Sequence, residues 1–351
     1  MFINSIATAV PPDCYTQAEC FAAFEQAPEF ARLKPRSREL VRKVLLADNG
    51  IDQRHVAVAE LAEAFQLNPD ALHRRFEKAA PTLATEAARK AVHEAGLDPA
   101  EIDAVIVSTC TGYLCPGLTS YVTERVGLRP DVHAMDLVGQ GCGASAPNLR
   151  TAHGLLKSGS VKRVLCICVE VCSAAFYLDD DPGVLVSACL FGDGAAAVVV
   201  SNEPGGGRRV EWKDGATHLS PADRDFLRFE QRGGMLRNLL DRQVPAIAAR
   251  HVENLLNEML VKNGLKRDDI SGWILHSGGR DVLKALGGQL GLSAKELHHS
   301  AETLRLFGNV SSPSVLFTLE RALREQQPGG WWWLTTFGAG FSCHGTLLRV
   351  E

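Results

Sequence analysis

The sequence predicts an α/β fold made of two related halves, because one order of elements runs through it twice. In the first half, an amphipathic helix (80–97) precedes a buried strand (103–109). The glycine turn GQGCGAS then opens another helix before the apolar strand VLCICVEV. The second half repeats this order as VPAIAARHVENLLNEMLVKNGL, SGWILHSGG, LRLFGNVSSPSVLFTLERAL and GGWWWLTTFGAG. The repetition lies in element order and not in residue identity.

A glycine-rich stretch marks where the two halves meet. The segment GGGRR (205–209) is the best candidate boundary, which gives an N-terminal half of residues 1–204 and a C-terminal half of residues 205–351. Two units suit a chain of 351 residues, at roughly 150 residues per domain. Within the first half we expect Thr82, or a polar residue near it, to cap the helix, and Gly96 to end it.

Composition excludes several classes of protein. The net charge of -4, with no long run of Lys and Arg, argues against a nucleic-acid-binding protein. No stretch reaches about 18 uninterrupted apolar residues, so no membrane span is expected. The N-terminus MFINSIATAVPPD lacks the basic and apolar regions of a signal peptide. We therefore expect a cytoplasmic protein.

The ten cysteines are expected to be thiols, since disulfides are rare in a long chain without an export signal. Cys166 and Cys168 form a C-x-C pair, which raises the possibility of zinc. No second Cys or His pair stands at a suitable spacing, so we interpret them as small apolar residues on a buried strand, and no metal site is predicted.

Cys142 is the leading candidate for a nucleophile. It lies in VGQGCGAS between a strand and a helix, and its flanking glycines permit a tight turn and close approach of a substrate. A thiol at a helix N-terminus is expected to have a lowered pKa, because the helix dipole stabilises the thiolate. The alternative is an inert buried thiol.

His276 and Asn309 are the candidate partners of Cys142. His276 ends the buried strand WILHSGG, and Asn309 lies in FGNVSSPS, at the start of the helix that corresponds to the helix after Cys142. Each has a plain structural alternative: a satisfied histidine at a strand end, and a helix-capping asparagine. Packing of the two halves about a pseudo-twofold axis would bring all three side chains together.

These three residue types suit the joining of two thioesters. The thiolate accepts an acyl group, and loss of CO2 from a malonyl thioester then creates an enolate. The histidine N–H and the asparagine amide are uncharged donors that stabilise the enolate oxygen, whereas an aspartate would repel it. Papain-like hydrolases also combine Cys, His and Asn, but their local cysteine signature is absent.

Five motifs in order, GQGCGAS, LFGDGAAA, HSGG, FGNVSSPSVLF and FGAGF, resemble those of type III polyketide synthases, the chalcone-synthase-like family. The resemblance implies a five-layered αβαβα thiolase-like fold and a homodimer. It also implies loading of a CoA-linked starter on Cys142, extension with malonyl-CoA, and no cofactor. Phe191 is implied as a gate, and Ser311, Gly338 and Gly340 as substrate-binding positions.

The sequence departs from the plant enzymes of this family at several positions. Asn238 stands near the position where the plant enzymes have a second gating Phe, and Ala175 and Cys110 stand near the positions of two of their pocket threonines. Ala339 replaces a proline of the plant enzymes. Cys110 and Ala175 favour a bacterial type of enzyme that takes fatty acyl starters to alkylresorcinols or alkylpyrones. The basic residues that hold CoA do not align cleanly, and the nearby candidates are Arg42, Lys43 and Arg54.

Other condensing enzymes are the main alternatives. A β-ketoacyl-ACP synthase III shares the fold, the nucleophile and the asparagine, but usually has H-Q-A-N where this sequence has H-S-G-G. HMG-CoA synthase would need a glutamate acid, for which no motif is found. A biosynthetic thiolase would use a second cysteine, and Cys343 follows the glycine loop instead of preceding it. A non-catalytic scaffold would typically lack the nucleophile.

Overall fold

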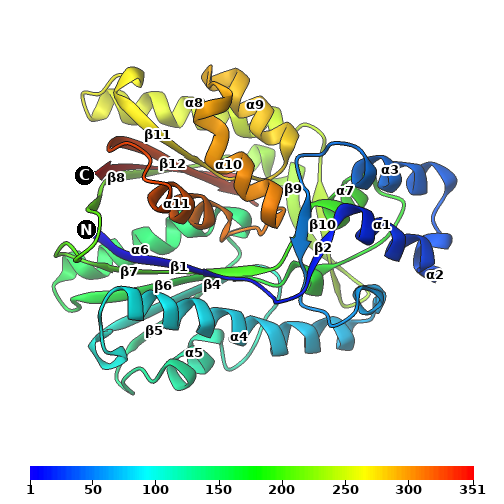
Figure 1. Ribbon diagram of the computed structural model, residues 1–351, viewed down its shortest axis with the longest axis horizontal. Helices are drawn as coiled ribbons and strands as arrows, with labels where there is room; N and C mark the ends of the chain where they lie inside the picture. The colour runs from blue at the N-terminus through cyan, green and yellow to red at the C-terminus, as the bar shows by residue number, and fades with distance from the viewer.

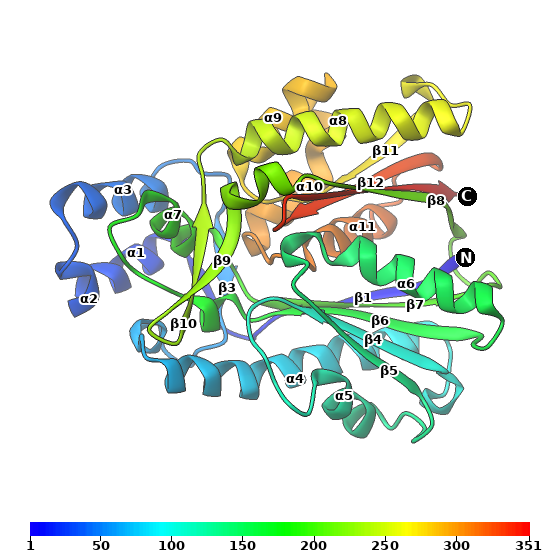
Figure 2. The ribbon, with the colours of Figure 1, turned by 180° about the vertical axis from the view of Figure 1, so that it is seen from behind.

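A computed structural model describes residues 1–351 as five layers of helices and strands. In Figure 1, two sheet regions lie one above the other, with α6 (Ser145–Ser158) and α11 (Ser314–Arg324) between them. The helices α8 (Val244–Lys262) and α9 (Arg280–Leu290) lie above, and α4 (Pro69–Glu94) and α5 (Leu118–Val126) lie below. Figure 2 shows the same layers from behind, with the hairpin of β9 (Leu227–Arg232) and β10 (Met235–Leu240) beside the end of the sheets. This is the αβαβα arrangement that the resemblance to type III polyketide synthases implies.

The strands form one sheet of nine, ordered β11-β12-β13-β8-β1-β7-β6-β4-β5. The first half contributes β1 (Phe2–Ala9), β4 (Ala104–Thr109), β5 (His133–Val138), β6 (Arg163–Glu170) and β7 (Gly194–Ser201). The second half contributes β8 (Val210–Leu219), β11 (Ile270–Leu275), β12 (Gly330–Gly338) and β13 (Ser342–Val350). The halves join through a short β1–β8 pairing of Phe2 with Glu211 and Ile3 with Val210.

The two halves repeat the same strand order and direction. From the junction outward, β1, β7, β6 and β4 pair antiparallel, antiparallel and parallel, and so do β8, β13, β12 and β11. The predicted repetition of elements is therefore present in the topology. The division between residues 204 and 205 as separate units stays a prediction.

Eleven α-helices surround these strands. The first half has α1 (Gln17–Gln26), α2 (Pro28–Ala31), α3 (Pro35–Leu46), α4 (Pro69–Glu94), α5 (Leu118–Val126), α6 (Ser145–Ser158) and α7 (Pro182–Leu190). The second has α8 (Val244–Lys262), α9 (Arg280–Leu290), α10 (Ala294–Phe307) and α11 (Ser314–Arg324). Two short ribbons, β2 (Cys14–Thr16) with β3 (Gln53–His55) and β9 (Leu227–Arg232) with β10 (Met235–Leu240), complete the chain.

The start of α4 corrects one prediction. The helix begins at Pro69, where the Asn68 side chain accepts a hydrogen bond from the N–H of Ala71 at 2.9 Å. Thr82 is not a cap, because it lies inside the helix and its hydroxyl donates to the carbonyl of Lys78. Pro81 removes only one backbone donor, so the helix continues through it.

The helices α6 and α11 lie at the centre of the molecule, where each packs against strands of both halves. Leu149 of α6 and Leu316 of α11 belong to a core cluster of 27 buried residues that also includes Val198 and Trp332 from the strands. Burial on both faces explains why β4, β6 and β7 consist of nearly unbroken apolar residues. The Cys166–Cys168 pair lies on β6 as free, buried thiols, as expected.

Candidate active site

Cys142 lies in a single 3-10 turn, Gly141–Gly143, between β5 and α6. Gly141 has φ of 54°, a left-handed conformation that favours glycine. The end of β12 packs directly against this turn: a methyl group on Gly338 would lie 2.5 Å from the nitrogen of Gly143. The Thr336 hydroxyl also donates to the carbonyl of Gly143 at 2.9 Å. The second half of the fold thus packs against the turn of the first half that carries Cys142.

A chain of short contacts links Cys142 to the other two predicted residues. Its Sγ lies 3.2 Å from Oγ of Ser311, and the N–H of Ser311 donates to Oδ1 of Asn309 at 2.8 Å. Nδ2 of Asn309 donates to the carbonyl of Gly278 at 3.1 Å, two residues after His276. The structure therefore brings Cys142, Asn309 and His276 into one connected cluster.

These contacts fix the orientation of the Asn309 amide. Its oxygen accepts from the backbone of Ser311, so its nitrogen must face Gly278. An amide nitrogen has two hydrogens, and Gly278 takes one of them. The second is available to a substrate oxygen. Ser311 itself has φ of 58°, and its hydrogen bond to Asn309 supports this unusual backbone.

The backbone of Asn309 is anchored to the segment that carries Phe191. Its N–H donates to the carbonyl of Leu190 at 2.9 Å, and its own carbonyl accepts from the N–H of Gly192 at 3.0 Å. Phe191, at the end of α7, is therefore tied directly to the candidate catalytic loop. It also lines the cavity that reaches Cys142.

His276 follows β11 directly and is almost completely buried, with 1% of its surface exposed. Its backbone N–H donates to the carbonyl of Thr335 at 3.1 Å, and its ring meets Phe337 edge to face at 5.0 Å. Nδ1 has no hydrogen-bond partner in the protein. Burial lowers the pKa of His276 to about 4, so the ring is neutral near pH 7.

The pKa of Cys142 corrects a prediction. Burial raises the pKa of this thiol to about 12, and the hydrogen bond from Ser311 opposes that rise only in part. The expected lowering by the helix N-terminus is therefore outweighed by loss of water around the sulfur. Cys142 is therefore a neutral thiol near pH 7, and a role as nucleophile would require a group that accepts its proton.

Glu170 is a buried site residue that sequence reasoning missed. It has no exposed surface and accepts hydrogen bonds from the hydroxyls of Ser312 (2.6 Å) and Thr111 (2.8 Å) and from the backbone N–H of Cys110 (3.0 Å). Burial raises the pKa of this carboxyl. A glutamate at the end of the apolar run VLCICVE is the signal that could have identified it, because charged side chains are rarely fully buried without partners.

Two cavities meet at the turn that carries Cys142, since Gly141 lines both. The first is narrow, with about 80 Å³ open to the centre of a water molecule, and 18 of its 27 lining residues are hydrophobic. It contains Cys142, Ala175, Phe191, Asn238 and Ser311. The second has about 550 Å³ by the same measure and contains Cys110. Both are lined by Thr111, Gly141, Arg228, Phe229 and Ala339.

The predicted CoA-binding residues have different surroundings. Arg42 and Lys43 are exposed on α3, as a phosphate-binding role requires. Arg54 is buried, and its guanidinium donates to the backbone carbonyls of Ala188 at 3.0 Å and Phe191 at 2.9 Å. These contacts favour a role for Arg54 in positioning Phe191. Gly340, with φ of 123°, lies in the loop between β12 and β13 beside the cavities.

The sequence matches the family models of the chalcone and stilbene synthases, the N-terminal domain over residues 2–204 and the C-terminal domain over residues 225–350. The chain belongs to this family. It is a type III polyketide synthase, an acyltransferase that condenses acyl units from acyl-CoA and malonyl-CoA. None of its helices has both the length and the apolar character needed to cross a membrane.

Relatives match the chain over nearly its whole length. A 1,3,6,8-tetrahydroxynaphthalene synthase of Streptomyces peucetius subsp. caesius is 32% identical, over 99% of this chain and 92% of its own. An alpha-pyrone synthesis polyketide synthase-like protein of Mycobacterium tuberculosis is 28% identical, over 99% and 91%. The crystal structure of PKS-I from the brown alga Ectocarpus siliculosus superposes with a TM-score of 0.92 at 26% identity, covering 99% of this chain and 98% of that one.

Proposed function

We propose that Cys142 carries the growing acyl chain and that His276 and Asn309 donate hydrogen bonds to the thioester oxygen during decarboxylation and condensation. The observation that supports these roles is the run of contacts from Cys142 through Ser311 and Asn309 to the turn after His276. A neutral imidazole and a neutral amide suit an oxygen that gains negative charge.

In the proposed cycle, the Cys142 sulfur attacks the carbonyl of an acyl-CoA, and its proton passes to the imidazole of His276. The acyl–sulfur bond to CoA breaks, and CoA leaves with that proton. Malonyl-CoA then loses CO2, and the electron pair of the broken bond moves to the thioester oxygen as an enolate. The enolate carbon attacks the acyl group on Cys142, which expels the cysteine as a thiolate and yields a β-ketoacyl-CoA. The thiolate then takes a proton from water, which restores the thiol.

Variants of the three residues test these roles. Cys142→Ala should abolish condensation, whereas Cys142→Gln, which mimics the acylated state, should retain decarboxylation of malonyl-CoA. Asn309→Ala should slow decarboxylation by about 100-fold or more, as expected for one lost oxyanion donor. Asn4→Ala, which removes an amide on β1 that donates to Glu203, is the matched control. Unchanged decarboxylation in Asn309→Ala would refute the role of that amide.

We also propose that the starter is a fatty acyl-CoA and that the product is of the alkylresorcinol or alkylpyrone type. The cavity lined by Cys142 extends to Leu61, Phe65 and Phe24, and an apolar lining suits an alkyl chain. The mycobacterial relative named for alpha-pyrone synthesis agrees with this proposal. The relative named for tetrahydroxynaphthalene supports an aromatic product instead.

A panel of acyl-CoAs with malonyl-CoA, followed by mass spectrometry, tests the starter. Long-chain starters should be extended, and Ala64→Phe should shorten the longest chain accepted, because Ala64 lines the apolar cavity. Ala62→Phe is the matched control, since Ala62 is exposed on the same turn. Turnover confined to short or aromatic starters would overturn the fatty acyl proposal. Malonyl carried on an acyl carrier protein should not replace malonyl-CoA, in contrast to a β-ketoacyl-ACP synthase III.

We further propose that the enzyme is a homodimer that pairs through β5. This strand is at the edge of the sheet, and Val138 at its end is 57% exposed. Tyr113, 69% exposed, lies with Val138 on the wall of the second cavity, which a partner subunit would close. Sedimentation should show a dimer that Val138→Asp dissociates and Val261→Asp, at an exposed position on α8, does not. A monomeric wild-type enzyme would contradict this proposal.

A further inference from the structure

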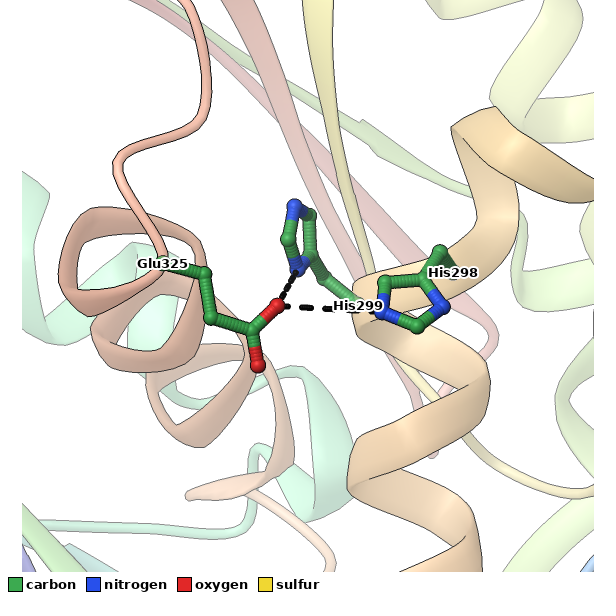
Figure 3. A group of neighbouring side chains, drawn as sticks. All are labelled: His298, His299 and Glu325. Carbon is green, nitrogen blue, oxygen red and sulfur yellow. Dashed lines mark ion pairs between the residues drawn. The ribbon is translucent and has the colours of Figure 1, made fainter.

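Two histidines and a glutamate outside the active site converge on one point. His298 and His299 are neighbours on α10, and Glu325 directly follows α11. Oε2 of Glu325 lies 3.2 Å from Nδ1 of His299 and 3.7 Å from Nε2 of His298, and all three atoms lie within 4.8 Å of one another. Figure 3 shows both rings turned toward this carboxylate.

His299 is the buried member of the group, with 8% of its surface exposed. Its Nε2 lies 3.1 Å from Oε1 of Gln327, and Nε2 of Gln327 donates to the carbonyl of Ser271 at 2.9 Å. That second bond fixes the Gln327 amide, so its oxygen is an acceptor and Nε2 of His299 must carry the hydrogen. In a neutral ring, Nδ1 of His299 is then an unprotonated acceptor.

Two acceptors therefore face each other across 3.2 Å. Nδ1 of His299 has no hydrogen-bond partner, although the Glu325 oxygen is close to it. The other oxygen of Glu325 is already paired with Arg321 at 2.5 Å, which leaves Oε2 free to accept. A positive species between Nδ1 and Oε2 resolves this arrangement, and the second imidazole, His298, faces the same oxygen.

We propose that His298, His299 and Glu325 bind a divalent transition-metal ion, for which zinc is the natural probe. Two imidazole nitrogens and one carboxylate oxygen are a zinc ligand set, with water at the fourth position. Zinc–ligand bonds near 2.0–2.2 Å require ligand atoms about 3.3 Å apart. The His299–Glu325 distance already meets this value, and the half-exposed His298 side chain has room to rotate inward.

The surroundings of His299 also resemble the outer shell of a metal site. A metal-bound histidine usually donates its other ring N–H to an oxygen, which fixes the tautomer and the ring orientation. Gln327 provides that oxygen, and Ser271 holds Gln327 in place. Neither main cavity includes these residues, so the ion would be a structural one.

The site would clamp the two helices that enclose the candidate catalytic loop. α10 ends at Phe307, two residues before Asn309, and α11 begins at Ser314, five residues after it. A metal bridge between the N-terminal part of α10 and the end of α11 would oppose separation of these helices. Because the ion binds the folded chain, it stabilises that state by mass action.

Calorimetric titration of Zn²⁺ into the full chain, freed of chelators, tests the inference. One equivalent should bind, and excess zinc at about 100 times Kd should raise Tm by roughly 5 °C. His299→Ala and Glu325→Gln should weaken binding at least about 10-fold, while His93→Ala, at an exposed histidine on α4, should leave it unchanged.

Because thiolates also bind zinc, the ten free cysteines require a second measurement that identifies the ligand atoms. Co²⁺ bound by nitrogen and oxygen should give visible bands without the near-ultraviolet charge-transfer band of a thiolate ligand. The Glu325 side chain is exposed and its change to Gln is conservative, so this variant should fold. It therefore tests the site even if His299→Ala fails to fold. Absence of binding in the wild type, thiolate bands, or full zinc affinity in Glu325→Gln would each overturn the site. None of these outcomes depends on condensation activity.

Discussion

Replacing Gly338 with alanine is the sharpest test of how the two halves assemble the active site. Gly338 ends β12, and its backbone conformation is one that alanine accepts, so the effect of the change is purely steric. The new methyl group would lie 2.5 Å from the nitrogen of Gly143, 2.7 Å from the carbonyl oxygen of Gln140 and 3.1 Å from the nitrogen of Cys142. All three atoms belong to backbone, which cannot rotate away as a side chain would.

The size of the effect follows from these distances. The nitrogen of Gly143 must retreat from 2.5 Å to at least 3.0 Å, so the turn that carries Cys142 has to shift or β12 has to bend. Overpacking of this kind lowers the free energy of unfolding by about 1–3 kcal/mol. For a chain of this size we expect Tm to fall by roughly 2–6 °C. Misplacement of a catalytic group by up to ~1 Å can slow the reaction by about 100-fold.

Differential scanning calorimetry and an assay of polyketide formation from malonyl-CoA measure the two effects. Gly288→Ala is the matched control, because nothing lies within 4 Å of its new methyl group and it lies inside α9. That change should stabilise the protein by about 0.5–1 kcal/mol and leave activity intact. If Gly338→Ala matched Gly288→Ala in both Tm and rate, the close contact between the halves would not control the nucleophile.

Three further predictions concern stability. Asn68→Ala should cost about 1 kcal/mol as a lost helix cap, whereas Thr82→Ala should cost much less, and equal losses in urea unfolding would contradict the observed start of α4. Glu170→Gln places N–H donors against the hydroxyls that now donate to the carboxylate, so unfolding should become easier by about 1–3 kcal/mol, and unchanged stability would argue against the network. Burial lowers the pKa of His344 to about 4 from 6.5, so unfolding takes up a proton in that window and the free energy of unfolding falls as pH drops through it. His344→Gln should reduce this slope by nearly one proton at pH 5, and an unchanged slope in pH-dependent urea unfolding would show that the ring is not buried neutral.

The sequence predicts the repeated part of the molecule well. The glycine turn at Cys142, the strand before His276 and the loop at Asn309 were each recognisable because local chemistry and element order agree there. Their meeting point followed from the pseudo-twofold repetition, which the matching strand orders of the two halves now show. The repetition was sufficient to predict that Cys142, His276 and Asn309 lie together in the fold.

Features that depend on burial were harder to predict. The dipole argument for Cys142 considers only the helix that follows it, whereas the pKa of the thiol depends on every atom that excludes water from the sulfur. The role of Glu170 cannot be read from its own segment, because Thr111 and Ser312, which donate to its carboxylate, come from distant segments. Likewise, Arg54 resembles a phosphate ligand in sequence until its carbonyl partners near Phe191 are known.

The two halves differ most in the insertions that line the narrow cavity. In each half, an insertion separates the first strand from the long outer helix: the segment with α1–α3 lies between β1 and α4, and the hairpin β9–β10 lies between β8 and α8. Both insertions line the narrow cavity, the first through Phe24 and Phe65 and the second through Phe229 and Asn238. The repeated core therefore carries the groups proposed to react, while the unrepeated insertions form walls of the cavity proposed for the acyl chain. Substitutions in these insertions should alter which acyl starter is accepted, with little effect on the rate of condensation. Substitutions at the turn that carries Cys142 should lower the rate of condensation, with little effect on starter selectivity.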